Sequence, residues 1–448
     1  MIYKMEEKYS EYLSDESKLR GKALSISFPK TRDEVLEVIQ HCKISNLSIT
    51  AQGGKSGIVG GAVPNNNHIL NSLNLTKIEK IDDETLSVQC GVNLNDLNNY
   101  IDRECKGYFF PVDTTEKTAT IGGIIASGSK GPNSHYYGES SSYIEEITVV
   151  FSDLSVKVLS SREDLFAKIF SSEGIYGFIL EAKIKLLKKP DYIWGITFFF
   201  KNIEDVCGFS AEIKEYQCNS EAKIVCGEFM DNHTIELIEL FKENMSKIKA
   251  IPPIPAGYNH LVYTEIHSDN ESDLVDTVEF LMKAAKKNNS DVEVSWAVSE
   301  DRDLENIRNY RHAAAECVNI IIEKRKSEIP DIRKIGLDIS LDEDLCETIE
   351  RYDIGDIDTV MFGHIFSSNL HLNFLPNNKN EFLKSLELVK ELSVYAEKRG
   401  GNIITEHGVG KLKKELFHML SEDAVINEIK KTKQDLDSEN IFNPNNII

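Results

Sequence analysis

Two histidines, His364 and His371, lie seven residues apart in the segment MFGHIFSSNLHLNF. Paired imidazoles are common in divalent-metal sites, but they are also common as packing residues in a strand. In one regular strand this odd separation would point the two rings to opposite faces of the sheet. The segment therefore leaves two interpretations open: packing histidines, or metal ligands brought together by a turn or bulge near Phe366, Ser367 and Ser368.

A second group of residues suited to chemistry is rich in glycine and lies at residues 53–61 and 120–131. Glycine lets backbone N–H groups approach a phosphate with no Cβ in the way. Gly54-Lys55-Ser56 resembles the end of a P-loop, but the first glycine of that motif is missing, and no G-x-G-x-x-G follows the first strand. A single loop of this kind is usually a turn. Two such loops, with FFPVDTT before the second, indicate an extended diphosphate that lies across both.

The elements that must position these residues alternate between strand and helix through residues 22–188. Lys188-Lys189-Pro190 is a plausible domain boundary, and residues 195–375 show a mixed α+β pattern. The predicted helices that follow the boundary are 232–248, 270–287, 380–398 and 423–435.

Composition limits the classes of function. A chain of 448 residues predicts about two or three domains, and the net charge of −22 argues against nucleic acid and anionic membranes as partners. The chain has no run of about 18 apolar residues, and it begins with a polar helical pattern, so we expect a cytoplasmic protein. Its eight cysteines include no C-x-x-C pair, which predicts reduced thiols and no built-in iron–sulfur relay.

Three segments, QGGKSGIVGGAVP, FFPVDTTEKTATIGG and SSEGIYGFILEAKIKL, resemble successive FAD-contacting segments of the vanillyl-alcohol oxidase-type flavoproteins. The last part of the chain resembles their 2-hydroxyacid dehydrogenase branch, which includes D-lactate dehydrogenase, D-2-hydroxyglutarate dehydrogenase and the glycolate oxidase flavin subunit. The resemblance implies an α+β fold. A PCMH-type FAD-binding domain of two subdomains would occupy residues 1–194, and a cap domain with an antiparallel sheet residues 195–395. Residues 396–448 would form a C-terminal segment that returns to the active site and completes the flavin pocket.

The resemblance also implies non-covalent FAD, with its diphosphate held at Gly53 to Gly57. Lys55 stands where relatives often carry another glycine, so its side chain either adds a cation for the diphosphate or crowds the loop. The residues implied to contact FAD are Gly53, Gly54, Lys55, Ser56, Gly57, Pro111, Asp113, Thr120, Gly122, Gly123, Ser127, Gly131, Glu173, Gly174, Ile179 and Asn443.

In the resembling branch, a G-H-x-G-D-G-N-L-H segment and an E-H-G pair form a divalent-metal site. Carried over by position, His364, His371 and Glu406 become the ligands, and His407 becomes the base beside the substrate. Two imidazoles and a carboxylate suit Zn²⁺, with Fe²⁺ or Mn²⁺ as alternatives. Such an ion would lower the pKa of a substrate hydroxyl, and a neutral imidazole is a suitable proton acceptor near pH 7.

Candidate cations for a substrate carboxylate lie upstream of the histidines. Arg311 matches the substrate arginine of the family, and Lys334 offers a second positive charge. Arg308 is a further candidate, and the alternative for both arginines is that they pair with acidic residues on a helix surface. Asn369 matches the asparagine before L-H and is expected to hydrogen-bond the substrate.

This chain departs from the family pattern between the two histidines. Phe366-Ser367-Ser368 replaces Gly-Asp-Gly. An aspartate at this place could orient a ligating imidazole. Glycines allow a tight turn, and Phe and Ser adopt a positive φ less readily. The substitution therefore leaves open whether the turn forms and how strongly a metal would bind.

The expected function is an FAD-dependent dehydrogenase of a small, lactate-like D-2-hydroxy acid. Hydride would pass to flavin N5, and the electrons would go on to a separate acceptor: an electron-transfer flavoprotein, a quinone or an iron–sulfur subunit. A homodimer is one possible assembly, and a partner could hold the protein at a membrane. The alternatives are a catalytically silent FAD-binding subunit of a redox complex and a non-redox flavoenzyme such as an alkylglycerone-phosphate synthase-like protein.

Overall fold

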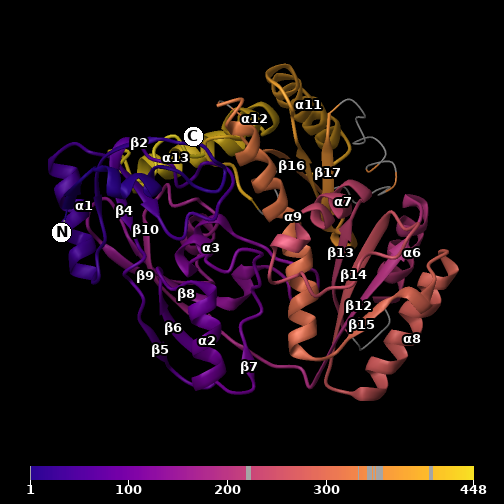
Figure 1. Ribbon diagram of the computed structural model, residues 1–448. Helices are drawn as coiled ribbons and strands as arrows, with labels where there is room; N and C mark the ends of the chain where they lie inside the picture. The colour runs from indigo at the N-terminus through magenta and orange to yellow at the C-terminus, as the bar shows by residue number, and fades with distance from the viewer. Residues whose placement is uncertain are drawn as a thin grey trace. The chain divides into compact units, whose positions relative to one another are not determined.

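The computed structural model describes residues 2–217, 223–330, 332–340, 346, 349, 357–402 and 407–448. The chain divides into two compact units (Figure 1). The first contains Met1–Ser134, Gly138–Lys189 and Glu406–Ile448, and the second contains His135–Tyr137 and Pro190–Thr405.

One sheet of the first unit has the strand order β1-β2-β4-β3, in which β2, β4 and β3 are parallel and β1 is antiparallel to β2. Helix α1 (Arg32–Ile44) connects β2 to β3, and its apolar stripe of Val35, Val38 and Ile39 is buried as the helical period predicts. Thr31 caps this helix by accepting a hydrogen bond from the Glu34 N–H. The strands are β1 (Ile2–Lys4), β2 (Lys22–Ser27), β3 (Ile49–Gln52) and β4 (Asn65–Asn71).

The other large sheet of the first unit is antiparallel, with the order β5-β6-β10-β8-β9. A short ladder pairs β7 with β11. The strands are β5 (Ile78–Lys80), β6 (Thr85–Gln89), β7 (Tyr108–Phe109), β8 (Ile144–Val150), β9 (Val156–Ser160), β10 (Phe178–Lys185) and β11 (Leu187–Lys188). The α-helices of this unit are α2 (Leu94–Glu104), α3 (Ile121–Ser127) and α5 (Asp164–Ile169). Helix α4 (Ser134–Tyr137) belongs to the second unit except for its first residue.

The C-terminal segment folds back onto the first sheet of this unit. The Ile49 N–H donates to the Ile441 carbonyl over 2.6 Å, and the Asn443 N–H donates to the Ile49 carbonyl over 2.8 Å. The buried ammonium of Lys433 donates to the carbonyls of Phe442 and Ile175. These bonds join the last residues of the chain to strand β3. The helices of this segment are α12 (Lys414–Leu420) and α13 (Asp423–Leu436).

The second unit is built on a seven-stranded sheet with the order β15-β12-β14-β13-β17-β18-β16, as far as the described residues show. All of its described pairings are antiparallel, which confirms the antiparallel sheet expected for the cap. The strands are β12 (Tyr192–Phe200), β13 (Lys223–Met230), β14 (His260–Ser268), β15 (Trp296–Val298), β16 (Ile335–Ser340), β17 (Thr359–His364) and β18 (Asn369–Phe374).

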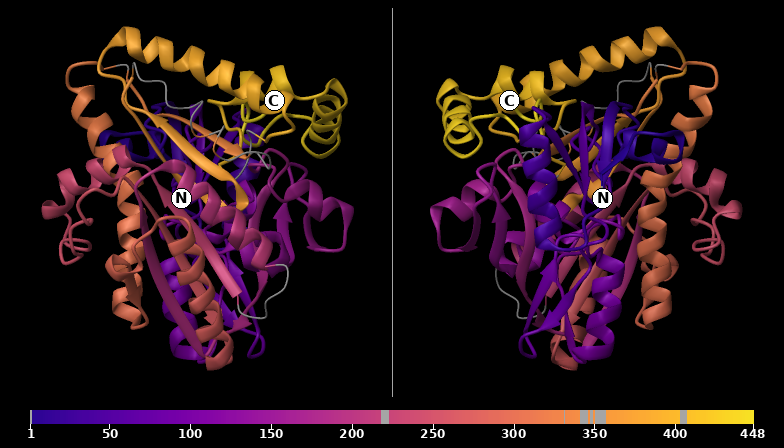
Figure 2. Two further views of the ribbon diagram at one scale, coloured as in Figure 1. Left: turned by 90° about the vertical axis from the view of Figure 1, so that its right-hand side faces the viewer. Right: turned by 90° about the vertical axis from the view of Figure 1, so that its left-hand side faces the viewer.

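Helices cover both faces of this sheet (Figure 1). Phe198 and Phe200 on β12 pack against Phe209 of α6, whereas Phe199 between them packs in the core that helix α9 shares. The two-residue period of a strand thus sends neighbouring phenylalanines to opposite faces. Helix α11 packs beside β16 (Figure 2). The helices are α6 (Ile203–Gln217), α7 (Asn232–Phe241), α8 (Glu271–Lys287), α9 (Asp301–Lys326) and α11 (Lys379–Lys398).

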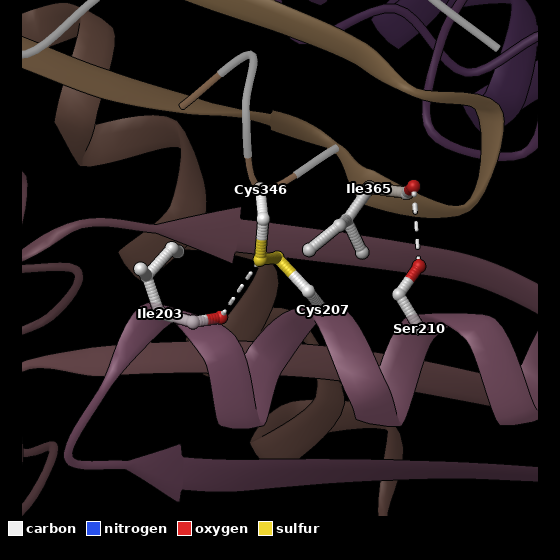
Figure 3. The surroundings of a disulfide bond; sticks show 5 residues. All are labelled: Ile203, Cys207, Ser210, Cys346 and Ile365. Atoms are coloured by element: carbon white, nitrogen blue, oxygen red, sulfur yellow. Dashed lines mark hydrogen bonds between the residues drawn. A yellow bond between two sulfur atoms is a disulfide. The ribbon is translucent and has the colours of Figure 1, made fainter. Parts of the chain in front are cut away.

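A disulfide joins Cys207 of helix α6 to Cys346 (Figure 3). The expectation of reduced thiols is therefore wrong for these two residues, because the fold brings together cysteines that lie 139 positions apart in the sequence. The free thiols among the described residues, those of Cys42, Cys90, Cys105, Cys226 and Cys317, are all buried. Among the same residues, no helix is both long and apolar enough to cross a bilayer.

Candidate active site

The turn that the histidine spacing requires is present. Strands β17 and β18 form a hairpin in which His364 pairs with Asn369 and Phe362 pairs with His371. Paired residues share a face, so both histidine side chains lie on one face of the sheet. Their ring centroids are 5.5 Å apart, and both residues are buried. This answers the question that the spacing left open, because a hairpin separates the two rings by a turn and not by one continuous strand.

The turn forms without glycine because neighbouring elements support it. Residues Ile365–Ser367 make a 3-10 turn, and Ser368 takes the left-handed conformation with φ 51°. The Ser368 hydroxyl accepts a hydrogen bond of 2.8 Å from Lys214 of α6. The Phe366 ring lies over Gly227 of β13 so closely that a Cβ at Gly227 would come within 2.4 Å of it. Gly227 thus leaves the space that Phe366 occupies.

Each histidine of the pair contacts a carboxylate through Nδ1. His364 Nδ1 lies 2.5 Å from Glu228 Oε1, and His371 Nδ1 lies 2.9 Å from Asp338 Oδ1. A carboxylate that is hydrogen-bonded to Nδ1 fixes the orientation of the imidazole ring. Asp338 and His371 also have donor atoms close enough for a shared metal ion. Asp338 and His371 therefore fit part of a divalent-metal site. The carboxylates beside the two histidines come from strands β13 and β16 and not from the turn.

Glu228 also binds Arg311, so three charged or polar side chains form one buried network. Arg311 Nε donates to Glu228 Oε2, and the guanidinium lies 5.2 Å from the centroid of the Phe362 ring. Burial alone would raise the pKa of Glu228, but His364 and Arg311 beside it lower that pKa to about 2. Glu228 is therefore a carboxylate at neutral pH. We call Arg311, Glu228 and His364 the first network.

A second network on the neighbouring strand has the same residue types. Arg308 donates to both carboxylate oxygens of Glu265, from Nε over 2.8 Å and from Nη2 over 2.6 Å. His267 Nε2 lies 2.8 Å from Glu265 Oε1, and the Tyr263 hydroxyl donates to Oε2 over 2.7 Å. His267 Nδ1 contacts the Tyr137 hydroxyl at 2.6 Å. Arg308 is thus paired with an acidic residue, as Arg311 is, but each acid lies on a strand of the sheet and not on a helix surface.

Asn369 presents an unusual buried oxygen. Its Oδ1 is buried and has no hydrogen-bond partner among the described residues. A buried acceptor without a partner costs about 1–3 kcal/mol, so such an atom marks a place where a ligand can bind. Asn369 pairs directly with His364, so this oxygen belongs to the same site as the histidine pair. Lys334 is half-buried immediately before β16.

In the first unit, the two glycine-rich loops pack against each other. A Cβ at Gly53 would lie 2.2 Å from Thr120 Oγ1, and one at Gly54 would lie 2.2 Å from the Thr118 carbonyl. Only glycine allows this approach. A Cβ at Gly57 would meet nothing within 4 Å, so the first loop is open on one side. The contact and the open backbone leave room for a diphosphate across both loops, and its binding there stays a prediction.

The side chain of Lys55 contacts residues outside its own loop. It adopts a left-handed φ of 58°, a conformation that glycine takes without strain and lysine does not. Its ammonium donates to the Glu11 carbonyl over 2.9 Å and lies 4.4 Å from the Tyr12 ring centroid. Lys55 thus fastens the loop to the 3-10 helix η1 (Glu7–Leu13).

Glu173 and Asn443, two of the residues implied to contact FAD, hold other backbone segments in place. Glu173 Oε1 accepts hydrogen bonds from the N–H groups of Val409 (2.6 Å) and Gly410 (2.9 Å). Asn443 donates to the Glu173 carbonyl and accepts from the Ala51 N–H, each over 2.7 Å. The Glu173 carboxylate therefore anchors the loop that follows His407. His407 is half-buried, and Glu406 lies outside the described residues.

The other implied FAD residues lie on loops and element ends of the same unit. Ser127 ends α3 and donates to the Gly123 carbonyl over 2.8 Å, and Asp113 pairs with Lys117. A Cβ at Gly131 would lie 1.9 Å from the Asp113 carbonyl oxygen, so this glycine too is required by close packing. The remaining positions are Ser56 in the first loop, buried Pro111, Gly122 in α3, Gly174 with φ 67°, and Ile179 in β10.

Sequence reasoning missed the three acidic residues Glu228, Glu265 and Asp338. Each is the only acidic residue of its strand segment, and the three segments are VCGEFM, VYTEIH and GLDIS. A single acid at an inward position of such a strand is a signal of a buried, paired carboxylate. The signal tells that a partner exists but not which residue it is.

Comparison with known proteins agrees with this architecture. Residues 23–160 match the family described as the FAD binding domain, and residues 189–447 match the C-terminal domain of FAD linked oxidases. The class is therefore an α+β flavoprotein with oxidoreductase domains. Since the second match spans more than half of the chain, this protein belongs to the FAD-linked oxidase family.

Relatives and solved structures extend the match over the whole chain. A D-lactate dehydrogenase of Anaerostipes hadrus is 26% identical over 98% of this chain and 92% of its own length. The glycolate oxidase subunit GlcD of Bacillus subtilis (strain 168) is 27% identical over 93% and 87%, respectively. A probable mitochondrial D-2-hydroxyglutarate dehydrogenase of Oryza sativa subsp. indica is 25% identical over 96% and 76%.

Two solved structures share the fold. A 4-ethylphenol oxidase from Gulosibacter chungangensis has a TM-score of 0.74 at 14% identity, covering 99% of this chain and 93% of its own. An alkyldihydroxyacetonephosphate synthase has a TM-score of 0.70 at 15% identity, covering 95% and 77%. These likenesses concern the fold alone. They confirm the vanillyl-alcohol oxidase-type architecture that the sequence predicted.

Proposed function

We propose that this protein is an FAD-dependent dehydrogenase that oxidises a small, lactate-like D-2-hydroxy acid to the 2-oxo acid. Membership in the FAD-linked oxidases and the names of the relatives support this reaction class. The observation that carries the proposal is the pair His364 and His371, buried on one face of the sheet and each held by a carboxylate. This arrangement suits a divalent ion beside an oxygen-rich substrate.

The proposed cofactors are non-covalent FAD and a divalent ion, Zn²⁺ or else Fe²⁺ or Mn²⁺, with His364, His371 and Glu406 as ligands. The loops containing Gly53 and Thr120 would hold the FAD diphosphate. When bound, FAD accepts the substrate hydride at N5, and the ion lowers the pKa of the substrate hydroxyl.

The chain's own residues would bind and orient the acid. His407 would take the hydroxyl proton, because a neutral imidazole is an effective acceptor near pH 7. Arg311 and Lys334 would supply positive charge for the carboxylate. The Arg311 bond to Glu228 uses one of the five N–H donors of its guanidinium. Asn369 Oδ1 would accept a hydrogen bond from the substrate, which would satisfy this buried oxygen.

The electrons would then pass to a separate acceptor, namely an electron-transfer flavoprotein, a quinone or an iron–sulfur subunit. We place the protein in the cytoplasm, with a homodimer as one possible assembly and a partner as its link to any membrane. The alternative is a catalytically silent FAD-binding subunit of a redox complex, and the test below distinguishes it from a dehydrogenase.

Anaerobic addition of D-lactate, glycolate, D-2-hydroxyglutarate and similar acids to the FAD-loaded protein tests the proposal. We expect at least one acid to bleach the visible flavin absorbance. The variant His407→Ala should keep FAD but lose about 10²–10⁴-fold in reduction rate, the contribution of a positioned base. No bleaching by any acid would favour the silent subunit, and wild-type reduction by His407→Ala would rule out this residue as the base.

A further inference from the structure

We propose that Glu228 is the positioning residue of the metal site, which holds the ring of His364 and couples it to Arg311. The inference rests on the proposed metal role of His364 and goes beyond it, since no sequence motif pointed to Glu228. The Glu228 carboxylate contacts a proposed metal ligand and a proposed substrate-binding residue. Its Oε1 lies 2.5 Å from His364 Nδ1, and its Oε2 accepts a hydrogen bond from Arg311 Nε.

The sheet itself fixes this contact. Glu228 of β13 is the register partner of His364 of β17, so the two side chains project from the same face of adjacent strands. Glu228 is 1% exposed and Arg311 is 4% exposed. A side chain this enclosed has few rotamers, so the imidazole has one orientation relative to the carboxylate.

The chemistry of the bond explains its use. A carboxylate that accepts the Nδ1–H of an imidazole selects the tautomer with its lone pair on Nε2 and makes that nitrogen a stronger ligand. The turn of this chain, Phe366-Ser367-Ser368, contains no acidic residue. Glu228 supplies that acidic group from a neighbouring strand instead. Arg311 balances its charge, which makes an ionised carboxylate tolerable at this depth.

The second network supplies a matched control. Glu265 is equally buried, also binds an arginine and a histidine, and lies on the adjacent strand β14. Its histidine, His267, has both ring nitrogens in hydrogen bonds, to Glu265 and to Tyr137. Neutralising Glu265 therefore imposes a similar structural cost without touching a proposed metal ligand.

The experiment measures Zn²⁺ affinity of the FAD-loaded, metal-stripped protein by competition with a chromophoric chelator. We expect Glu228→Gln to weaken Zn²⁺ binding by about 10–100-fold, the usual effect of removing a ligand's carboxylate partner. Glu265→Gln should stay within about threefold of wild type, because His267 is not a ligand in this scheme. Visible flavin absorbance and circular dichroism report FAD content and folding for every variant.

The double variant Glu228→Gln/Arg311→Met is measured alongside, because the single change leaves a buried cation unpaired. It should show the same loss of Zn²⁺ affinity in a fully neutral site. Wild-type affinity in Glu228→Gln or in the double variant would overturn the inference, as would an equal loss in Glu265→Gln. Failure of the wild-type protein to bind Zn²⁺ would instead overturn the proposed metal role itself.

Discussion

The two Arg–Glu–His networks of the second unit have the same residue types but different surroundings. Arg308 and Arg311 are three positions apart on α9, and their carboxylate partners lie on the adjacent strands β14 and β13. In the second network, His267 is bonded at both ring nitrogens and the side chain of Arg308 is 37% exposed. In the first network, His364 lies 5.5 Å from another carboxylate-held histidine, and the side chain of Arg311 is only 5% exposed.

This difference shows that the same residue types can stand in different chemical surroundings. Both glutamates are ionised, because a cation and a histidine beside each of them lower its pKa against the effect of burial. What separates the networks is the β17–β18 hairpin together with strand β16. The hairpin adds His371 and an Asn369 oxygen that has no hydrogen-bond partner among the described residues, and β16 adds Asp338. The second network, with two tyrosine hydroxyls, has the composition of a structural hydrogen-bond cluster.

The largest contrast is expected when the histidine of each network is removed. His364→Ala should lose bound metal and slow flavin reduction by about 100-fold or more, because a Lewis acid contributes several kcal/mol. His267→Ala should keep its metal and reduce within about tenfold of wild type. Metal analysis of protein purified without chelator, together with anaerobic stopped-flow absorbance, measures both. Equal losses in the two variants would contradict the distinction between the networks.

A smaller contrast concerns stability. Arg311→Met leaves Glu228 buried with one partner fewer, and we expect a loss of about 3–5 kcal/mol in the free energy of unfolding. Arg308→Met should cost only about 1–3 kcal/mol, because Arg308 is partly exposed and Glu265 keeps its bonds to Tyr263 and His267. Urea unfolding monitored by circular dichroism gives both values. A larger loss for Arg308→Met than for Arg311→Met would contradict the expectation that the more buried arginine contributes more to stability.

Acid should reduce the stability that ionised Glu265 contributes to the second network, and the variant Glu265→Gln tests this. The pKa of Glu265 is held below its ordinary value by Arg308 and His267, although burial opposes this shift. A folded-state pKa below the unfolded one adds stability above about pH 4.3, and this contribution is lost as the pH falls further. Glu265→Gln should therefore show a shallower decrease in unfolding free energy between about pH 5 and 3. Parallel curves for wild type and variant would argue against an ionised Glu265.

The smallest effect is expected at the turn that distinguishes the first network. Ser368→Gly relieves a left-handed backbone but removes the hydroxyl that accepts from Lys214, so the net change should be below about 1 kcal/mol. Thermal unfolding of the loaded protein measures it. Loss of Zn²⁺ in this variant would show that the serine hydroxyl, and not the strand register, holds the histidines together.

Much of the fold and part of the site could be predicted from the sequence. The glycine loops around Gly53 and Gly122 have short-range signatures, because close backbone approach tolerates only glycine. The paired histidines and Asn369 also stand in a recognisable segment. Arg308 could be assigned only as one of two alternatives, because helix spacing does not show which acid faces it. The disulfide between Cys207 and Cys346 was not foreseen at all.

The sequence by itself determined the class of protein, a flavoprotein with glycine-rich loops in one part and a histidine segment in another. Tertiary structure decided which acids serve the histidines. Glu228 lies 136 positions from His364, and Asp338 lies 33 positions from His371. Such contacts depend on strand order and register, which arise only when the whole sheet assembles, so no local pattern records them. The same assembly places Phe366 over Gly227, and it thereby makes a glycine-free turn compatible with the site.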